Sequence, residues 1–162
     1  MVYNTALGYV QNMEDAEEVM QDVFVEIHQS LKTFRGESAL KTWIYRITIN
    51  KSLDFLKYKK RKKRFSPFIS ILSSDSIEPG FDTPDFNHPG VLLENKERAA
   101  ILFKAINTLP EMQRTVFLLA KLEDLGNMEI AEILNKKPGA IESLLSRAKE
   151  NLKSVLREYY KS

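Results

Sequence analysis

The residues with the clearest chemical potential lie in one stretch, FRGESALKTWIYRITINKSLDFLKYKKRKKR, which runs from Phe34 to Arg64. It begins with aromatic and polar side chains, and seven of its last eight residues are Lys or Arg, interrupted by Tyr58. A solvent-exposed helix needs the charge but not the rings, whereas a core helix needs the rings but not the charge. The combination is typical of a surface that holds a polyanion and contacts flat rings.

Other kinds of functional site find little support in the sequence. It has no cysteine, which excludes disulfides and thiolate metal sites and agrees with a reducing cytoplasm. The two histidines, His28 and His88, fall on a polar helical face and in a Pro-rich segment, so we predict no metal site. Without a nucleophile–base pair or a phosphate-binding glycine loop, we predict no enzyme and no cofactor. Because there is no long apolar run and no secretory signal, we predict a cytoplasmic protein with no membrane insertion.

Charge is distributed in blocks, although the net formal charge is only +2. Residues 1–31 carry six acids and no base, and residues 32–64 carry twelve bases against two acids. Residues 65–90 carry four acids and no base, and the remainder has twelve bases and ten acids. Such blocks indicate different partners for different segments.

The elements that position the first two blocks are predicted to be two helices. In residues 14–31 apolar side chains recur every three or four positions, which predicts an inward face of Ala16, Val19, Met20, Val23, Phe24, Ile27 and Leu31. A second helix is predicted to begin near Ser38 or Ala39, with Ser38 as a possible N-cap. Its predicted inward face is Leu40, Trp43, Ile44 and Ile47, and Tyr45 lies off that stripe.

The rest of the chain is predicted to form a linker and a second helical domain. Residues 65–90 hold four of the six prolines and show no helical period, which indicates a flexible, acidic linker. Helices are predicted at 92–107, 110–122, 127–134 and 139–158, with Pro110 and Pro138 at first helical positions. The last two resemble a helix-turn-helix, with Ala131 at the crossing and Asn135 in the left-handed turn. We therefore predict an all-α fold with domains at 1–64 and 91–162.

Two stretches resemble a known family. EDAEEVMQDVFVEIHQSLKTFRGESALKTWIYRITINKSLDFLKYKKRKKR is similar to region two of the bacterial extracytoplasmic-function sigma factors. LPEMQRTVFLLAKLEDLGNMEIAEILNKKPGAIESLLSRAKENL resembles their region four. The order of the two helical domains and the linker also matches, so the resemblance covers most of the chain.

The resemblance implies a protein that directs RNA polymerase to promoters and melts them. Aromatic and polar side chains would contact the unpaired nucleobases, and Lys and Arg side chains would bind the phosphates. For the −10 element it implies contacts from Phe34, Arg35, Ser38, Tyr45, Arg46, Asn50, Lys51, Lys57, Lys59, Lys60 and Arg61. For the −35 element it implies contacts from Lys136, Lys137, Ala140, Ser143, Ser146, Arg147 and Lys149. We interpret Trp43 as a core residue, because it shares the apolar stripe.

The implied partners are core RNA polymerase, through its beta-prime clamp and beta flap, promoter DNA, and an anti-sigma factor. Polymerase contacts are implied for Glu18, Gln21, Asp22 and Glu26. Plain solubility remains an alternative role for this acidic stripe. The resemblance implies that the acidic linker runs toward the RNA exit path and mimics nucleic acid, and an inert tether is the alternative. The basic run, taken alone, is more often a solvated face or a nonspecific patch.

Some positions depart from the family pattern. The chain begins partway through the family's opening helix, and Lys136 stands in the turn where an apolar residue is usual. Glu142 and Leu144 stand where Lys or Arg is common. An acid in a recognition helix repels phosphate unless it accepts from a cytosine amino group, so we predict weak or unusual −35 binding. Two alternatives remain: a degenerate decoy that binds polymerase or an anti-sigma factor, and a freestanding helix-turn-helix regulator.

Overall fold

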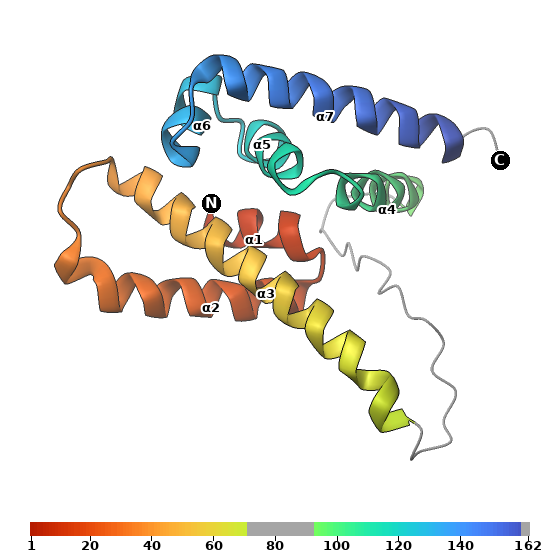
Figure 1. Ribbon diagram of the computed structural model, residues 1–162, viewed down its shortest axis with the longest axis horizontal. Coiled ribbons are helices and arrows are strands. Elements are labelled where there is room, and N and C mark those ends of the chain that lie inside the picture. The colour runs from red at the N-terminus through yellow and green to blue at the C-terminus, as the bar shows by residue number, and fades with distance from the viewer. Residues whose placement is uncertain (71–92, 160–162) are drawn as a thin grey trace.

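The computed structural model describes residues 1–70 and 93–159, and the regular elements of these ranges are all helices (Figure 1). The all-α prediction is therefore confirmed. The N-terminal half, residues 1–70, contains α1 (Val2–Val10), α2 (Met13–Ser30), the short 3-10 helix η1 (Leu31–Thr33) and α3 (Leu40–Ser70). The C-terminal half, residues 93–159, contains α4 (Leu93–Asn107), α5 (Glu111–Lys121), α6 (Asn127–Leu134) and α7 (Pro138–Tyr159).

Helix α2 forms where its amphipathic pattern predicted it, but its buried face is narrower. The side chain of Asn12 caps its start by accepting from the Asp15 N–H at 2.9 Å. Ala16, Val19 and Val23 are buried in a small cluster between α1, α2 and α3. Phe24 and Leu31, predicted to point inward, are 54% and 51% exposed. A bundle of three helices covers only part of the predicted stripe, which leaves these two side chains on the surface.

Helix α3 begins at Leu40, and the Trp43 N–H donates to the Ala39 carbonyl at 3.1 Å, so Ala39 rather than Ser38 stands at the N-cap position. The predicted inward face was partly wrong, because Leu40 is 48% exposed whereas Tyr45 is only 2% exposed. Among the α3 side chains that the structure describes, the buried ones are Thr42, Tyr45, Thr48, Ile49 and Ser52. Helices α1 and α2 pack on one side of α3 and α6 on another, so its contacts do not follow one stripe.

The C-terminal half follows the prediction closely. Asn135 adopts the left-handed conformation (φ 51°, ψ 51°) between α6 and α7, and the Lys136 N–H donates to the Ala131 carbonyl at 2.9 Å. Ile130 and Ile141 are fully buried where the two helices meet. Helix α7 begins at Pro138 as predicted, whereas α5 begins at Glu111 and leaves Pro110 at the N-cap.

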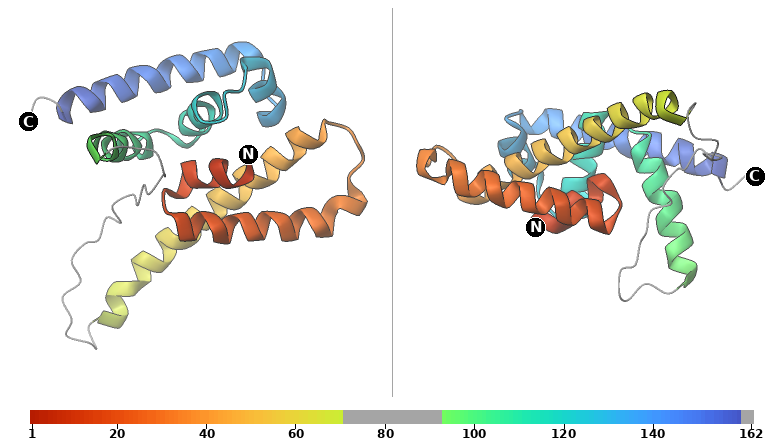
Figure 2. Two further views of the ribbon diagram at one scale, coloured as in Figure 1. Left: turned by 180° about the vertical axis from the view of Figure 1, so that it is seen from behind. Right: turned by 90° about the horizontal axis from the view of Figure 1, so that it is seen from below.

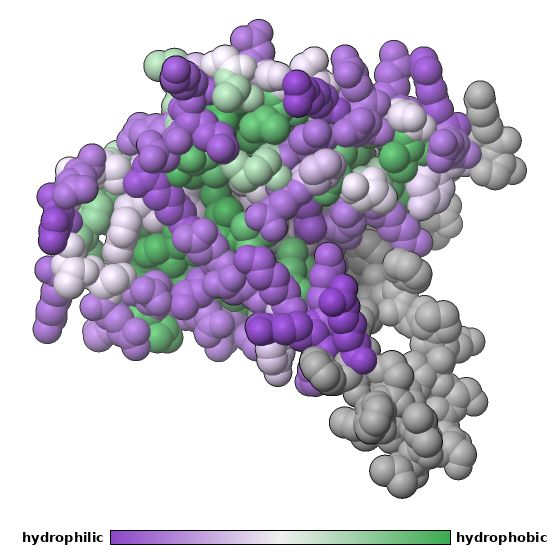
Figure 3. Space-filling view, in the orientation of Figure 1, coloured by the Kyte–Doolittle hydropathy of each residue, from purple (hydrophilic) through white to green (hydrophobic). Residues whose placement is uncertain are grey.

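The two halves pack directly on each other, α1 against α5 and α3 against α6 (Figures 1 and 2). One apolar cluster crosses the junction and joins Tyr9, Tyr45 and Ile49 to the core of the C-terminal half. At Gly8 the helices approach so closely that an added Cβ would lie 2.7 Å from Leu122 Cδ1. Hydrophilic side chains cover most of the face shown in Figure 3, with apolar ones in patches between helices.

Helix α3 continues past residue 64, where we placed the end of the first domain, to Ser70. Lys and Arg are good helix formers, so the basic run extends the helix rather than ending it. The remaining predicted linker residues, 71–90, lie outside the described ranges. No helix in the described ranges is both long and apolar enough to cross a bilayer.

Candidate nucleic-acid interface

The basic end of α3 forms an open groove. Its lining consists of Asp54, Lys57, Lys60, Arg61 and Arg64, and all of these side chains are exposed. Lys57 lies 3.5 Å from Asp54, but both side chains are more than 60% exposed, so this ion pair holds Lys57 only weakly. The groove can therefore bind phosphates of a nucleic-acid backbone.

Two other lysines that were predicted to bind DNA form ion pairs with acidic residues of α2. Lys51 Nζ lies 3.1 Å from Glu26 Oε2, and Lys59 contacts Asp15. The acidic stripe of α2 and the basic side of α3 thus partly face each other within one domain. Glu26, predicted to contact polymerase, serves as an internal partner here, whereas Glu18, Gln21 and Asp22 are exposed.

The aromatic part of the predicted −10 surface lies at the loop before α3. The rings of Phe34 and Trp43 have centroids 5.0 Å apart and are tilted by 43°, and both side chains are half-buried. Arg35 is exposed beside Gly36, whose positive φ of 70° suits glycine. Ser38 is half-buried and Asn50 is exposed on α3. Phe34, Arg35 and Asn50 thus remain within reach of a ligand.

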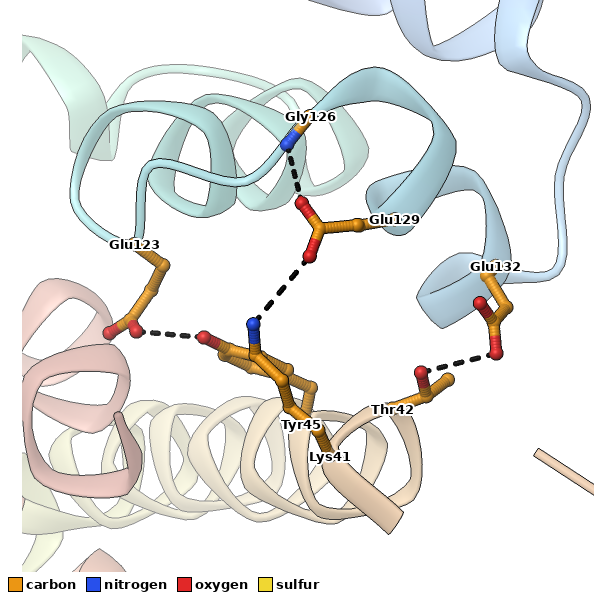
Figure 4. A network of polar contacts seen from close by, with 7 residues as sticks. All are labelled: Lys41, Thr42, Tyr45, Glu123, Gly126, Glu129 and Glu132. Atoms are coloured by element: carbon orange, nitrogen blue, oxygen red, sulfur yellow. Dashed lines mark hydrogen bonds and ion pairs between the residues drawn. The ribbon is translucent and has the colours of Figure 1, made fainter. Parts of the chain in front are cut away.

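Tyr45 has a different environment from the one predicted. Its hydroxyl donates to Glu123 Oε2 at 2.9 Å (Figure 4). The Thr5 hydroxyl donates to the other oxygen of that carboxylate, also at 2.9 Å. Burial, with the hydrogen bond to Glu123, raises the pKa of the Tyr45 hydroxyl far above its ordinary value. Tyr45 therefore stays a proton donor, and in this arrangement its ring is covered rather than open to a base.

The neighbours of Tyr45 on α3 are also engaged by the C-terminal half. Arg46 Nε donates to the Ile133 carbonyl at 2.9 Å and Arg46 Nη2 to the Glu132 carbonyl at 2.7 Å. The Thr42 hydroxyl donates to Glu132 Oε1 at 3.2 Å, and Lys41 Nζ lies 3.5 Å from Glu129 Oε1 (Figure 4). Of the predicted −10 residues, Tyr45 and Arg46 are therefore brought to α6 and its preceding loop.

The acids at this junction were not identified from the sequence. Glu123 lies in the loop after α5, and Glu129 and Glu132 lie on α6. The Gly126 N–H, which donates to Glu129 Oε2 at 2.9 Å, lowers the pKa of that carboxyl together with Lys41, so it stays ionised. No local pattern marks their contacts with the N-terminal half, because the hydrogen-bond partners of Glu123 and Glu132 there lie 78 to 118 positions away in the sequence.

The predicted −35 surface is open. Lys136, Lys137, Ala140, Ser143, Ser146, Arg147 and Lys149 are all exposed at the turn and along α7. Glu142 is exposed among them. Leu144 instead packs against the apolar core. It is therefore a core position, and a leucine there does not remove a DNA contact. A helix with exposed polar and basic side chains, after a tight turn that carries two lysines, is suited to a DNA groove.

Comparison with known proteins matches each half of the chain to a family model. The family model Sigma-70 region 2 matches residues 1–62, and the model Sigma-70, region 4 matches residues 93–152. The ECF RNA polymerase sigma-E factor of Escherichia coli is 32% identical over 136 residues, which cover 84% of this chain and 71% of that protein. Its namesake from Haemophilus influenzae is 32% identical over 145 residues, covering 88% and 75%.

Two solved structures share the fold. One is the sigma factor RpoE in complex with the anti-sigma factor NepR from Bartonella quintana, with a TM-score of 0.61 and 23% identity, covering 96% of this chain and 89% of that one. The other is CnrH in complex with the cytosolic domain of CnrY, with a TM-score of 0.65 and 19% identity, covering 97% and 80%.

Proposed function

The chain belongs to the extracytoplasmic-function sigma factors of bacterial RNA polymerase, and we propose that it recognises and melts promoters by reading the −10 element with its N-terminal half and the −35 element with its C-terminal half. One observation carries the proposal: exposed cations line a groove at the basic end of α3, and the rings of Phe34, in the preceding loop, and Trp43, on the helix, lie at its other end. Aromatic rings for unpaired bases and cations for phosphates are what a single strand requires.

The proposed domains are residues 1–64 and 91–162, with residues 65–90 as the connection between them. In the N-terminal domain, Phe34, Arg35 and Asn50 contact bases, and the exposed cations of the α3 groove hold the backbone. In the C-terminal domain, α7 enters the major groove with Ser143, Ser146 and Arg147. The reaction itself belongs to polymerase, so the proposed protein is a cytoplasmic regulatory subunit rather than an enzyme.

The proposed polymerase contact is the exposed face of α2. Glu18, Gln21 and Asp22 are exposed there, and Phe24 and Val25 add an apolar surface that is 54% and 55% exposed. Acids around exposed apolar side chains suit a basic, partly apolar partner such as the beta-prime clamp. The C-terminal domain would contact the beta flap. Because two structures of the same fold are complexes with an anti-sigma factor or a cytosolic partner domain, an anti-sigma factor is also proposed.

The function is tested by mixing the purified chain with core polymerase and a library of promoters melted around the −10 element. We expect saturable polymerase binding, selection of particular −10 sequences, and transcripts that begin downstream of them. Polymerase binding without selection would favour the decoy alternative. Duplex selection without polymerase would favour the freestanding regulator, and no binding to polymerase would contradict the proposal.

A further inference from the structure

The last turns of α3 extend away from the body of the molecule. Figure 1 shows this end of the helix projecting beyond the other helices. The helix runs to Ser70, past residue 62, where the match to the Sigma-70 region 2 model ends. Between residues 57 and 64 the described side chains are exposed, except that Lys59 is half-buried and contacts Asp15. This end of α3 can therefore be approached by a partner from several sides.

The exposed side chains at this end do not all belong to the groove described above. Four cations line that groove, namely Lys57, Lys60, Arg61 and Arg64. Tyr58 and Lys62 are also exposed, but they are not part of its lining. They stand four positions apart, so they share a second side of the helix. A nucleic-acid strand that occupies the groove leaves this second side uncovered.

The second side combines positive charge with an aromatic ring. Tyr58 is 53% exposed. At about 3.6 residues per turn, it falls between Arg61 and Lys62 around the helix axis. Tyrosine rings are enriched at the level of lipid headgroups, and lysine keeps its charge in water while its stem lies on an apolar surface. A ring with cations on both sides is therefore suited to the surface of a bilayer.

The positive charge at this end is only partly cancelled by acids of the same chain. Asp54 lies 3.5 Å from Lys57, and Asp15 of α2 contacts Lys59. Lys60, Arg61 and Lys62 stand beyond these two ion pairs and are exposed. Clusters of four or more lysines and arginines on a helix are typical of segments that bind anionic lipids.

We propose that the basic end of α3 is a peripheral binding site for an anionic lipid surface. Its cations bind lipid phosphates, and Tyr58 lies at the level of the headgroups. A flat anionic surface attracts cations around a wide arc of a helix, so it uses Lys62 as well as the groove. The inference does not rest on the proposed function, because it requires neither polymerase nor a promoter. Since lipid and DNA phosphates bind the same groove cations, a membrane and a single strand compete for Lys60 and Arg61.

The first test measures cosedimentation of the full chain with lipid vesicles. The anionic vesicles contain about one third phosphatidylglycerol in phosphatidylcholine, and the neutral vesicles contain phosphatidylcholine alone. We expect the chain to bind the anionic vesicles, to bind the neutral ones far less, and to be released by added salt or by single-stranded DNA. Each cation near an anionic surface strengthens binding about fivefold, so the loss of three should weaken it on the order of a hundredfold.

Two variants that lose the same charge show whether this cluster is the site. Lys60→Gln/Arg61→Gln/Lys62→Gln removes three cations from the end of α3. The matched control, Lys104→Gln/Lys121→Gln/Lys153→Gln, removes three exposed cations that are scattered over the C-terminal half. We expect the clustered variant to lose on the order of a hundredfold in affinity for anionic vesicles, and the scattered control to lose less than about threefold.

A third variant separates lipid binding from the groove that is proposed to hold DNA. Tyr58→Ala/Lys62→Gln changes the second side of the helix and leaves the groove lining intact. We expect it to lower vesicle affinity about tenfold and to change affinity for single-stranded DNA less than about twofold. Because the sequence has no cysteine, an environment-sensitive fluorophore can be attached through Tyr58→Cys alone, with Ser154→Cys on α7 as its control. Anionic vesicles should shift the emission of the first label to the blue and leave the second unchanged.

Several results would overturn the lipid-binding site. Equal losses in the clustered and scattered variants would show that net charge alone attracts the chain to vesicles. Unchanged vesicle affinity in Tyr58→Ala/Lys62→Gln would show that lipid occupies only the groove, as any polyanion would. A shift at Ser154→Cys without one at Tyr58→Cys, or binding of vesicles together with single-stranded DNA, would place the contact elsewhere on the chain. Circular dichroism checks that each variant keeps its helices, and transcription with core polymerase in the absence of vesicles tests the proposed function separately.

Discussion

The two predicted DNA surfaces of this molecule differ in how their side chains are engaged. On α7 the predicted contacts, including Ser143 and Arg147, are exposed, whereas on α3 Tyr45 and Arg46 bind the other half of the chain. Both predicted surfaces contain Lys, Arg and Ser, and the α3 surface adds aromatic rings. The difference comes from what packs against them, since α6 and its preceding loop bring acids to α3, and the outer side of α7 faces solvent.

The comparison shows that a surface able to bind DNA can also bind the chain's own acids. A duplex-reading helix such as α7 needs exposed side chains that insert into a groove. A surface for unpaired bases needs aromatic rings and hydrogen-bond donors. When no ligand is present, a folded protein pairs such donors with its own acceptors if they become buried. The N-terminal surface is therefore more readily covered than the C-terminal one.

The largest expected effect lies at the contact between the two halves, where Tyr45 becomes buried. Tyr9 donates to Thr115 Oγ1 at 2.8 Å between α1 and α5, and both side chains are buried. We expect Tyr9→Phe to lower the free energy of unfolding by about 2 kcal/mol, because it leaves the Thr115 hydroxyl without its partner. Urea unfolding of Tyr9→Phe, Thr115→Val and the double variant forms a double-mutant cycle. Strictly additive losses would show that the two halves are not coupled through this bond.

Part of this organisation could be predicted from the sequence, because helices leave local patterns. The buried Ala16, Val19 and Val23 of α2 follow the helical period, and Asn135 was placed in the turn because it tolerates a left-handed backbone. The exposed basic run of α3 was likewise evident from composition. Each of these features depends on neighbours in the sequence.

The features that could not be predicted depend on contacts across the two halves. Tyr45 lies off the stripe of Trp43 and Ile47, so the period placed it on the surface, yet Glu123 and α6 bury it. Leu144 was counted as a lost DNA contact, although it packs on the core. A single helical period describes one buried face, and α3 has more than one.

The second prediction compares the cations of the two halves directly. Replacing Lys57, Lys60 and Arg61 with Gln removes three side chains of the α3 groove. We expect affinity for single-stranded DNA to fall about tenfold and the slope of its logarithm against salt to flatten by about 2. Replacing Lys136, Lys137 and Arg147 with Gln removes the same charge from the C-terminal half and is expected to change this binding much less. Equal losses would show that net charge, rather than the α3 groove, holds the strand.

The third prediction concerns the open surface of α7. Glu142 is exposed among the predicted contacts and opposes phosphate. We expect Glu142→Lys to raise affinity for duplex −35 DNA about fourfold and to steepen the salt slope by about 0.9, which corresponds to one new phosphate contact. Glu150→Lys, further along the same helix and also exposed, is the matched control. Unchanged affinity in Glu142→Lys would show that α7 does not approach DNA through this position.

The smallest expected effect concerns the ion pair between α2 and α3 within the N-terminal half. Glu26 lies 3.1 Å from Lys51, and both side chains are more than one third exposed, so the pair contributes little to stability. Glu26→Gln frees Lys51 for phosphate, and we expect about a twofold gain in single-stranded DNA affinity, whereas Glu18→Gln, which changes the same charge on the same helix, should give none. If both variants gain equally, the acids of α2 act only through their long-range field. If Glu26→Gln alone gains, acids from both halves restrain the −10 surface, and the contrast with α7 extends along α3 as far as Lys51.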